Sequence, residues 1–414
     1  MSLEVRTLEA SDYSGWLRAT RLGFLRSATV SDEEIELRRP YTDLARAQGA
    51  FDDGRCVATF RSMPRDVTVP GGAVLPSSAI TQVTVSATHR RRGVASRMMA
   101  NELAATAERG EPLAILIAAE FPIYGRFGFG AAAGVTEWHV DTARAGLRTP
   151  ADDEDGRVEL VDPADVFKSG PELHERVRLQ APGSINRNDR WWELFTGKVQ
   201  VPGGDPWKEP IFAFYRDSAG RIDGLAAYTV DDKWRGMYPE SPLEVKQLIA
   251  ATPAAERALW RFLLSIDWVT TVRTGFRAHD DVMPLLLGDR RAARIDNSSD
   301  FLWLRFIDVP RALAARTYAA PGAVVLDVVD PYGYAAGRFR VEAAPDGTAT
   351  AEAAPSVAPD LTLTAADLAT LYLGDESAVR LATVGQATES HPGAAARVDA
   401  LFRTSRKPWA IDGF

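Results

Sequence analysis

The chain has 414 residues, enough for two or three domains, and its 46% hydrophobic and 25% charged residues are ordinary for a globular protein. Its formal net charge of −8 argues against a general nucleic-acid-binding protein. The single cysteine, Cys56, excludes an internal disulfide and a cysteine-based zinc site, and the five histidines show no metal-binding spacing. We expect no metal, no membrane span and a cytoplasmic location, since no signal peptide is visible, although this does not exclude secretion.

The first predicted unit, residues 1–150, mixes helices with strands in the manner of an α/β sheet. Cys56 lies in one of the predicted strands, where a buried core thiol is a commoner role than catalysis. Trp16 and Phe24 are candidates either for the core or for the wall of an amine pocket. The predicted elements are helices at 18–24 and 32–37, strands at 55–64, 66–69, 79–85 and 113–117, and a tight turn at 70–72.

A basic turn follows the strand at 79–85 and has the pattern Arg90-x-x-Gly93-x-Ala95 before a predicted helix. Gly93 has no Cβ, so an anion can approach its backbone closely, and the free N–H groups of the helix start favour negative charge. Arginine side chains add donors for phosphate oxygens. The alternative is a solvated basic turn, but the order of strand, turn, glycine and helix favours a pyrophosphate site.

A second motif, Phe121-Pro-Ile-Tyr124-Gly-Arg-Phe-Gly-Phe129, follows the apolar strand at 113–117. A group-transfer reaction needs a base for the attacking nucleophile and an acid for the leaving group. The tyrosine hydroxyl, with a usual pKa near ~10, stays protonated at neutral pH and can serve as that acid. By itself Tyr124 fits a packing role as well as an acid role.

Two further units are predicted, at 151–297 and 298–414, after an acidic linker at 152–156. The second repeats the element order of the first, with a hairpin at 212–230, a strand at 243–250 and a helix that Thr252 caps and Pro253 begins. It lacks the glycine and the basic cluster, so we expect it not to bind a pyrophosphate. The third alternates strands at 301–306, 324–329, 337–341 and 361–363 with a helix at 365–373.

The basic turn and the tyrosine motif, some 30 residues apart, resemble the Eis (enhanced intracellular survival) family of actinobacterial GNAT N-acetyltransferases. Trp303-Leu-Arg305, Val309-Pro-Arg-Ala-Leu313 and Leu371-Tyr-Leu-Gly374 resemble the C-terminal part of that family, so the resemblance covers nearly the whole chain. It implies two fused GNAT folds, the second degenerate, and a sterol-carrier-protein-like α+β domain. It also implies a hexamer built from two trimers, and acetyl-CoA as cosubstrate.

The resemblance assigns roles to particular residues. Tyr124 becomes the general acid, and the terminal carboxylate of Phe414 becomes the general base, although most chain termini are frayed. Relatives often have serine at Ala119, so a side-chain hydrogen bond to the cofactor is lost there. The acetyl-CoA contacts fall on Val83, Thr84, Val85, Arg91, Arg92, Gly93, Val94, Ala95, Ser96, Ala119 and Glu120.

Three functions compete for this sequence. The first is acetyl transfer to primary amines of polycationic small molecules such as aminoglycosides, or to lysine side chains. The second is a lipid-binding protein with a vestigial GNAT unit, and the third is a scaffold that binds coenzyme A with little turnover. The intact basic turn and Tyr124 favour the enzyme over the two alternatives. The second unit has lost the glycine and the basic cluster, whereas the first unit has kept them.

Overall fold

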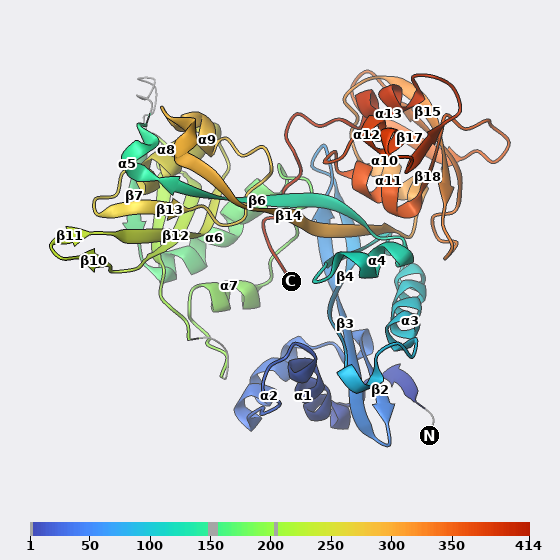
Figure 1. The fold of residues 1–414 in the computed structure, drawn as a ribbon, viewed down its shortest axis with the longest axis horizontal. Coiled ribbons are helices and arrows are strands. Elements are labelled where there is room, and N and C mark those ends of the chain that lie inside the picture. The colour runs from blue at the N-terminus through green and yellow to red at the C-terminus, as the bar shows by residue number, and fades with distance from the viewer. Residues whose placement is uncertain (1–2, 148–155, 203–205) are drawn as a thin grey trace.

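The computed structural model describes residues 3–147, 156–202 and 206–414, so most of the acidic linker expected at 152–156 lies outside the described residues. Within those ranges, twelve strands form one mixed sheet, which we call the large sheet, and five form a second, the small sheet (Figure 1). The strand order of the large sheet is β1-β2-β3-β4-β5-β14-β6-β13-β12-β9-β8-β7. No described helix is long and apolar enough to cross a membrane.

The first part of the large sheet comes from the N-terminal third of the chain. Its parallel pair, β4 and β5, is joined by helix α3, which packs Met98 and Leu103 into the core over the sheet. The strands are β1 (Glu4–Thr7), β2 (Ala47–Asp52), β3 (Arg55–Thr68), β4 (Val74–Val85), β5 (Leu113–Ile117) and β6 (Gly130–Asp141), and the helices are α1 (Tyr13–Gly23), α2 (Asp32–Arg38), α3 (Val94–Glu108), α4 (Phe121–Tyr124) and α5 (Thr142–Ala145).

The other part repeats this order, with α8 joining the parallel strands β12 and β13. Thr252 caps α8 through its side chain and Pro253 begins it, which confirms the prediction. The antiparallel hairpin of β8 and β9 is also confirmed. The elements are β7 (Arg157–Val161), α6 (Pro163–Arg178), α7 (Asp189–Phe195), β8 (Ile211–Arg216), β9 (Ile222–Val230), β10 (Trp234–Arg235), β11 (Tyr238–Pro239), β12 (Ser241–Ala250), α8 (Pro253–Leu264), β13 (Val269–Arg273), α9 (Met283–Leu286) and β14 (Ala293–Phe306).

Two long strands, β6 and β14, hold the two parts in one sheet (Figure 1). The N-terminal half of β14 pairs only with β6, whereas its C-terminal half, Leu302 to Phe306, inserts between β5 and β6. The strand expected at 301–306 therefore forms, but in the large sheet and not with the third unit. The expected division after residue 297 falls inside β14, because the alternation of side chains does not reveal which strand will be the partner.

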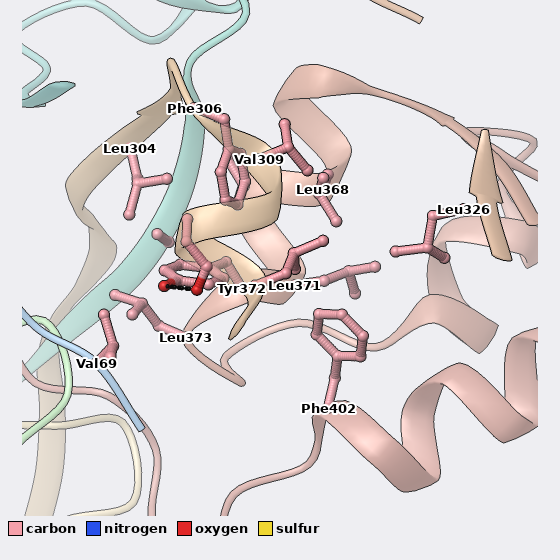
Figure 2. Packing of buried hydrophobic residues seen from close by; sticks show 14 of the residues in the cluster. Val69, Leu304, Phe306, Val309, Leu326, Leu368, Leu371, Tyr372, Leu373 and Phe402 are labelled. Carbon is pink, nitrogen blue, oxygen red and sulfur yellow. Dashed lines mark hydrogen bonds between the residues drawn. The ribbon is translucent and has the colours of Figure 1, made fainter. Parts of the chain in front are cut away.

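The C-terminal part packs helices against the small sheet, whose strand order is β17-β16-β15-β18-β19. Figure 2 shows its core, in which Leu304 and Phe306 of β14 meet Leu371 and Tyr372 of α11, so this domain shares a core with the large sheet. The elements are α10 (Val309–Ala315), β15 (Gly322–Val329), β16 (Gly337–Ala343), β17 (Ala349–Ala353), β18 (Leu361–Thr364), α11 (Ala365–Tyr372), α12 (Ala378–Thr383), β19 (Ala387–Glu389) and α13 (Ala394–Phe402).

Candidate active site

A cavity opens where β4 and β5 part. The two strands pair in parallel as far as Ile80 and Leu116, and beyond that point β4 continues to Val85 while the chain after β5 turns into α4. The cavity there has a volume of about 680 Å³. All the cofactor-contact residues predicted from the sequence line it except Arg92, and Tyr124 lines it as well.

A bulge in β4 shapes one wall. Gln82 has a φ of +53°, and β3 pairs Thr59 with Thr84 but Arg61 with Thr81, so β4 carries one extra residue here. The Thr59 hydroxyl donates to the Gln82 carbonyl at 2.8 Å, which satisfies the group that the bulge displaces. Gly23, at the end of α1, lies against Thr84; a Cβ there would be only 2.3 Å from that side chain. This close approach brings the exposed Phe24 to the cavity.

The basic turn forms the other wall and leads into α3. Gly93 is the N-cap residue, with a φ of +74°, and an ideal Cβ built on it would meet no atom within 4 Å. The first hydrogen bond of α3 runs from the Arg97 amide to the Gly93 carbonyl at 3.0 Å, so the amides at 94–96 precede the helical bonding pattern. His89 anchors the turn through Nε2, 3.0 Å from Asp52. The turn thus presents open space, amides and exposed arginines, which fits a pyrophosphate.

Tyr124 ends α4 with its side chain 8% exposed, and its ring lies against Phe129 and Trp303, with centroids 6.3 and 6.5 Å away. Across the described ranges, no protein group makes a hydrogen bond to its hydroxyl. Burial, and to a lesser extent the neighbouring Glu120, raise the pKa of Tyr124 above its usual 10.0. The phenol is therefore protonated at neutral pH and faces a cavity.

The C-terminus returns to the same region of the large sheet. The chain leaves α13 and ends between β4 and the second part of the sheet, where Figure 1 marks the terminus. The Thr81 hydroxyl donates to the terminal Phe414 oxygen at 3.2 Å, just past the point where β4 and β5 part. Thr81 precedes the bulge by one residue, so the carboxylate lies beside the β4 segment that lines the cavity.

Several sequence candidates lie elsewhere. Trp16 is 1% exposed and donates from its indole to the Gln48 carbonyl, so it belongs to the core and not to a pocket wall. Arg92 turns away and donates to the Thr88 carbonyl at 3.3 Å. Burial raises the pKa of the Cys56 thiol to about 12, which is the state of an unreactive structural cysteine.

The structure also adds residues that local patterns did not single out. Gly23, Ile123 and Arg126 line the cavity, and the basic Arg126 two residues after Tyr124 was the only sequence signal among them. Within the described ranges, no group of three or more His, Cys, Asp or Glu side chains is arranged to hold a metal ion.

Known families match all three parts of the chain. An acetyltransferase (GNAT) domain matches residues 4–132, a second acetyltransferase (GNAT) domain matches 183–306, and a sterol carrier protein domain matches 309–411. N-acetyltransferase Eis of Mycobacterium tuberculosis is 35% identical over 86% of this chain and 85% of its own. The chain belongs to the Eis family. It therefore has two GNAT domains and a sterol-carrier-like domain, and it is an acetyl-CoA-dependent N-acetyltransferase.

Two other similarities extend over nearly the full length of this Eis-family protein. An uncharacterized N-acetyltransferase of Streptomyces avermitilis is 52% identical over 100% of this chain and 99% of its own. The crystal structure of Eis1 from Mycobacterium abscessus is 31% identical and superposes with a TM-score of 0.86 over 99% of this chain and 100% of that one.

Gly93→Ala should weaken acetyl-CoA binding at least about tenfold, because the added methyl group would enter the open space and the left-handed backbone disfavours a side chain. Gly110→Ala is the matched control. Gly110 has a φ of +70° and equally open space but lies at the far end of α3, so it carries the same backbone strain without a ligand. Calorimetric titration with acetyl-CoA compares them, and equal loss in both variants would contradict a phosphate contact at Gly93.

Proposed function

We propose that this Eis-family enzyme acetylates primary amines of polycationic small molecules, aminoglycosides being the example implied by the family, or lysine side chains. The proposal includes Tyr124 as general acid and the terminal carboxylate of Phe414 as general base. It also includes the hexameric assembly that the family resemblance implies, and a cytoplasmic location.

One observation carries the proposal: a single cavity gathers the basic turn and Tyr124, and the chain terminus lies beside its β4 wall. The basic turn supplies a place for the pyrophosphate, and the bulged β4 strand runs from there toward Thr81. Glu120 places a carboxylate near Tyr124 in the cavity, and the net charge of −8 is compatible with a cationic acceptor.

The roles follow from the chemistry of these groups. Acetyl-CoA supplies the activated thioester. The Tyr124 hydroxyl gives its proton to the sulfur as the carbon–sulfur bond breaks, and the raised pKa keeps that proton in place until then. The Phe414 carboxylate accepts, through a bridging water, the proton that the amine nitrogen loses as its bond to the acetyl carbon forms. A free α-carboxyl has a pKa of about 3.5, so the carboxylate is ionised at neutral pH.

The lipid-carrier alternative finds less support, because buried side chains fill the core shared by the small-sheet domain. Tyr372 and Arg316 are almost completely buried there. The Arg316 guanidinium donates to the Phe402 carbonyl at 2.8 Å and also to the Tyr372 carbonyl, and the Tyr372 hydroxyl donates to the Ala312 carbonyl at 2.7 Å. A buried cation holding backbone carbonyls is a poor lining for a sterol.

The test is release of the coenzyme A thiol from acetyl-CoA with a panel of aminoglycosides and linear polyamines. We expect turnover with acceptors that carry several primary amines, and no turnover with the same acceptors after chemical N-acetylation. Binding of acetyl-CoA without thiol release for any amine, including lysine peptides, would instead support the scaffold function.

A further inference from the structure

The two GNAT domains part their parallel strands in matching places. In the first, β4 and β5 separate after Ile80 and Leu116, and the cavity of the candidate site fills the gap. In the second, β12 and β13 pair as far as Glu244 and Arg273 and then separate. By position, the gap beyond them corresponds to the cofactor cleft. Its helix, α8, begins with Pro253 and carries Glu256 in its first turn, which disfavours a phosphate.

The C-terminal tail of the same chain occupies this second gap. Trp409 and Ile411 face the segments 245–248 and 274–277 across a space of about 110 Å³, and Trp409 also lines a cavity of about 180 Å³ at the start of α8. The Trp409 amide donates to the Pro182 carbonyl at 2.8 Å, and its indole donates to the Phe276 carbonyl at 3.2 Å. The Arg277 guanidinium lies 4.2 Å from the centre of the Trp409 ring and donates to the Leu248 carbonyl at 2.6 Å, so it closes the gap over the tail.

A buried ion pair then fixes the tail two residues before its end. Arg187 is bidentate on Asp412, with distances of 2.8 and 2.6 Å, and the two side chains are 1% and 5% exposed. His174 of α6 contributes a ring nitrogen 3.2 Å from Asp412. Burial opposes the charge on Asp412, but the attraction of Arg187 and the hydrogen bonds with His174 and Arg187 together outweigh it and lower the pKa of this carboxyl.

The ion pair at Asp412 restricts where the terminal carboxylate can lie. Two residues of extended chain span at most about 7 Å, so fixing Asp412 confines the terminal carboxylate to a small region around its contact with Thr81. The segment that carries Arg187 also includes Ser184 and Asn186, and it contacts the first domain. There the Asp66 amide donates to the Asn186 side chain at 3.0 Å. The anchor is therefore tied to the same domain that carries the cavity.

We propose that the cofactor cleft of the second GNAT domain has become the seat of the C-terminal tail, with Arg187 as the positioning residue that sets the Phe414 carboxylate beside Thr81. The proposal deepens the proposed function and rests on the base role of that carboxylate. It gives the degenerate domain a task in the reaction that does not need coenzyme A.

The test uses full-length variants and two independent measurements. Arg187→Met should speed the release of Phe414 by carboxypeptidase and lower kcat, each at least about tenfold, while the Kd for acetyl-CoA stays within about twofold. Arg187→Lys keeps the charge without the bidentate geometry, so it should fold even if Arg187→Met does not. Its rate of Phe414 release and its kcat should lie between those of Arg187→Met and those of the parent. Arg176→Met is the control, since Arg176 pairs with Asp223 in the same domain and Arg221 still pairs with Asp223.

The outcomes separate the two proposals. Faster release together with lower kcat supports both. Faster release with unchanged kcat supports the seat but overturns the base assignment of the proposed function. Unchanged release in both Arg187 variants overturns the seat, whatever happens to kcat.

Discussion

Replacing Tyr124 by phenylalanine should lower kcat by about 10²- to 10⁴-fold, the usual contribution of a general acid. The ring and its contacts with Phe129 and Trp303 remain, so only the proton donor is lost. The KM and Kd for acetyl-CoA should change by less than about threefold, because the basic turn that we expect to hold the phosphates lies on the α3 side of the cavity. Thiol release at saturating acetyl-CoA and amine measures the effect.

Tyr228→Phe is the matched control, because Tyr228 is a buried tyrosine of the second domain whose pKa is likewise raised by burial. It should leave kcat unchanged. The pH profile adds a check of sign: with the pKa of Tyr124 raised above 10.0, the acid form persists throughout the neutral range and is lost only at more alkaline pH. A Tyr124→Phe enzyme with kcat within threefold of the parent would place the acid elsewhere.

Extending the chain by two glycines beyond Phe414 should lower kcat at least about 100-fold. The extension converts the Phe414 carboxylate into a neutral amide and moves the new terminus up to about 7 Å from the Thr81 hydroxyl. Acetyl-CoA binding should persist, since Phe414 does not line the cavity of the basic turn.

Two controls separate the main-chain carboxylate from the side chain and from the added residues. Phe414→Leu keeps the carboxylate and should retain kcat within about tenfold, the loss reflecting packing of the ring against the shared core. The same two glycines added at the N-terminus should have no effect. Full activity of the extended chain would overturn the terminal base and leave a pocket carboxylate or water in its place.

Local sequence patterns predicted several elements of the first two domains. Strand β5, the turn before α3 and the Thr252 cap of α8 formed where they were expected, because each is specified by neighbouring residues. The strands expected at 55–64 and 66–69 instead form the single strand β3. A proline is tolerated inside β3 because β2 pairs with β3 only as far as Arg61. Pro64 therefore has a neighbouring strand, β4, on one side only, and no strand on the other side needs the N–H that proline lacks.

Local sequence patterns could not predict which strands pair with one another. The segment at 301–306 reads as a strand, but only the folded chain inserts it between β5 and β6 and joins the two GNAT domains in one sheet. A period of two fixes which side chains share a face and leaves open which strand lies alongside.

The sequence by itself determined that the chain has a basic, glycine-containing turn before a helix, a tyrosine motif beyond the next strand, and a second copy of the domain without the glycine and arginines of that turn. These are properties of adjacent residues, because turns, caps and helix starts are local. Only the tertiary structure decided that the second cleft holds the tail and that Arg187 anchors Asp412, 225 residues away. Such contacts depend on where the whole sheet places two distant segments, and neither segment carries a local signal of its partner.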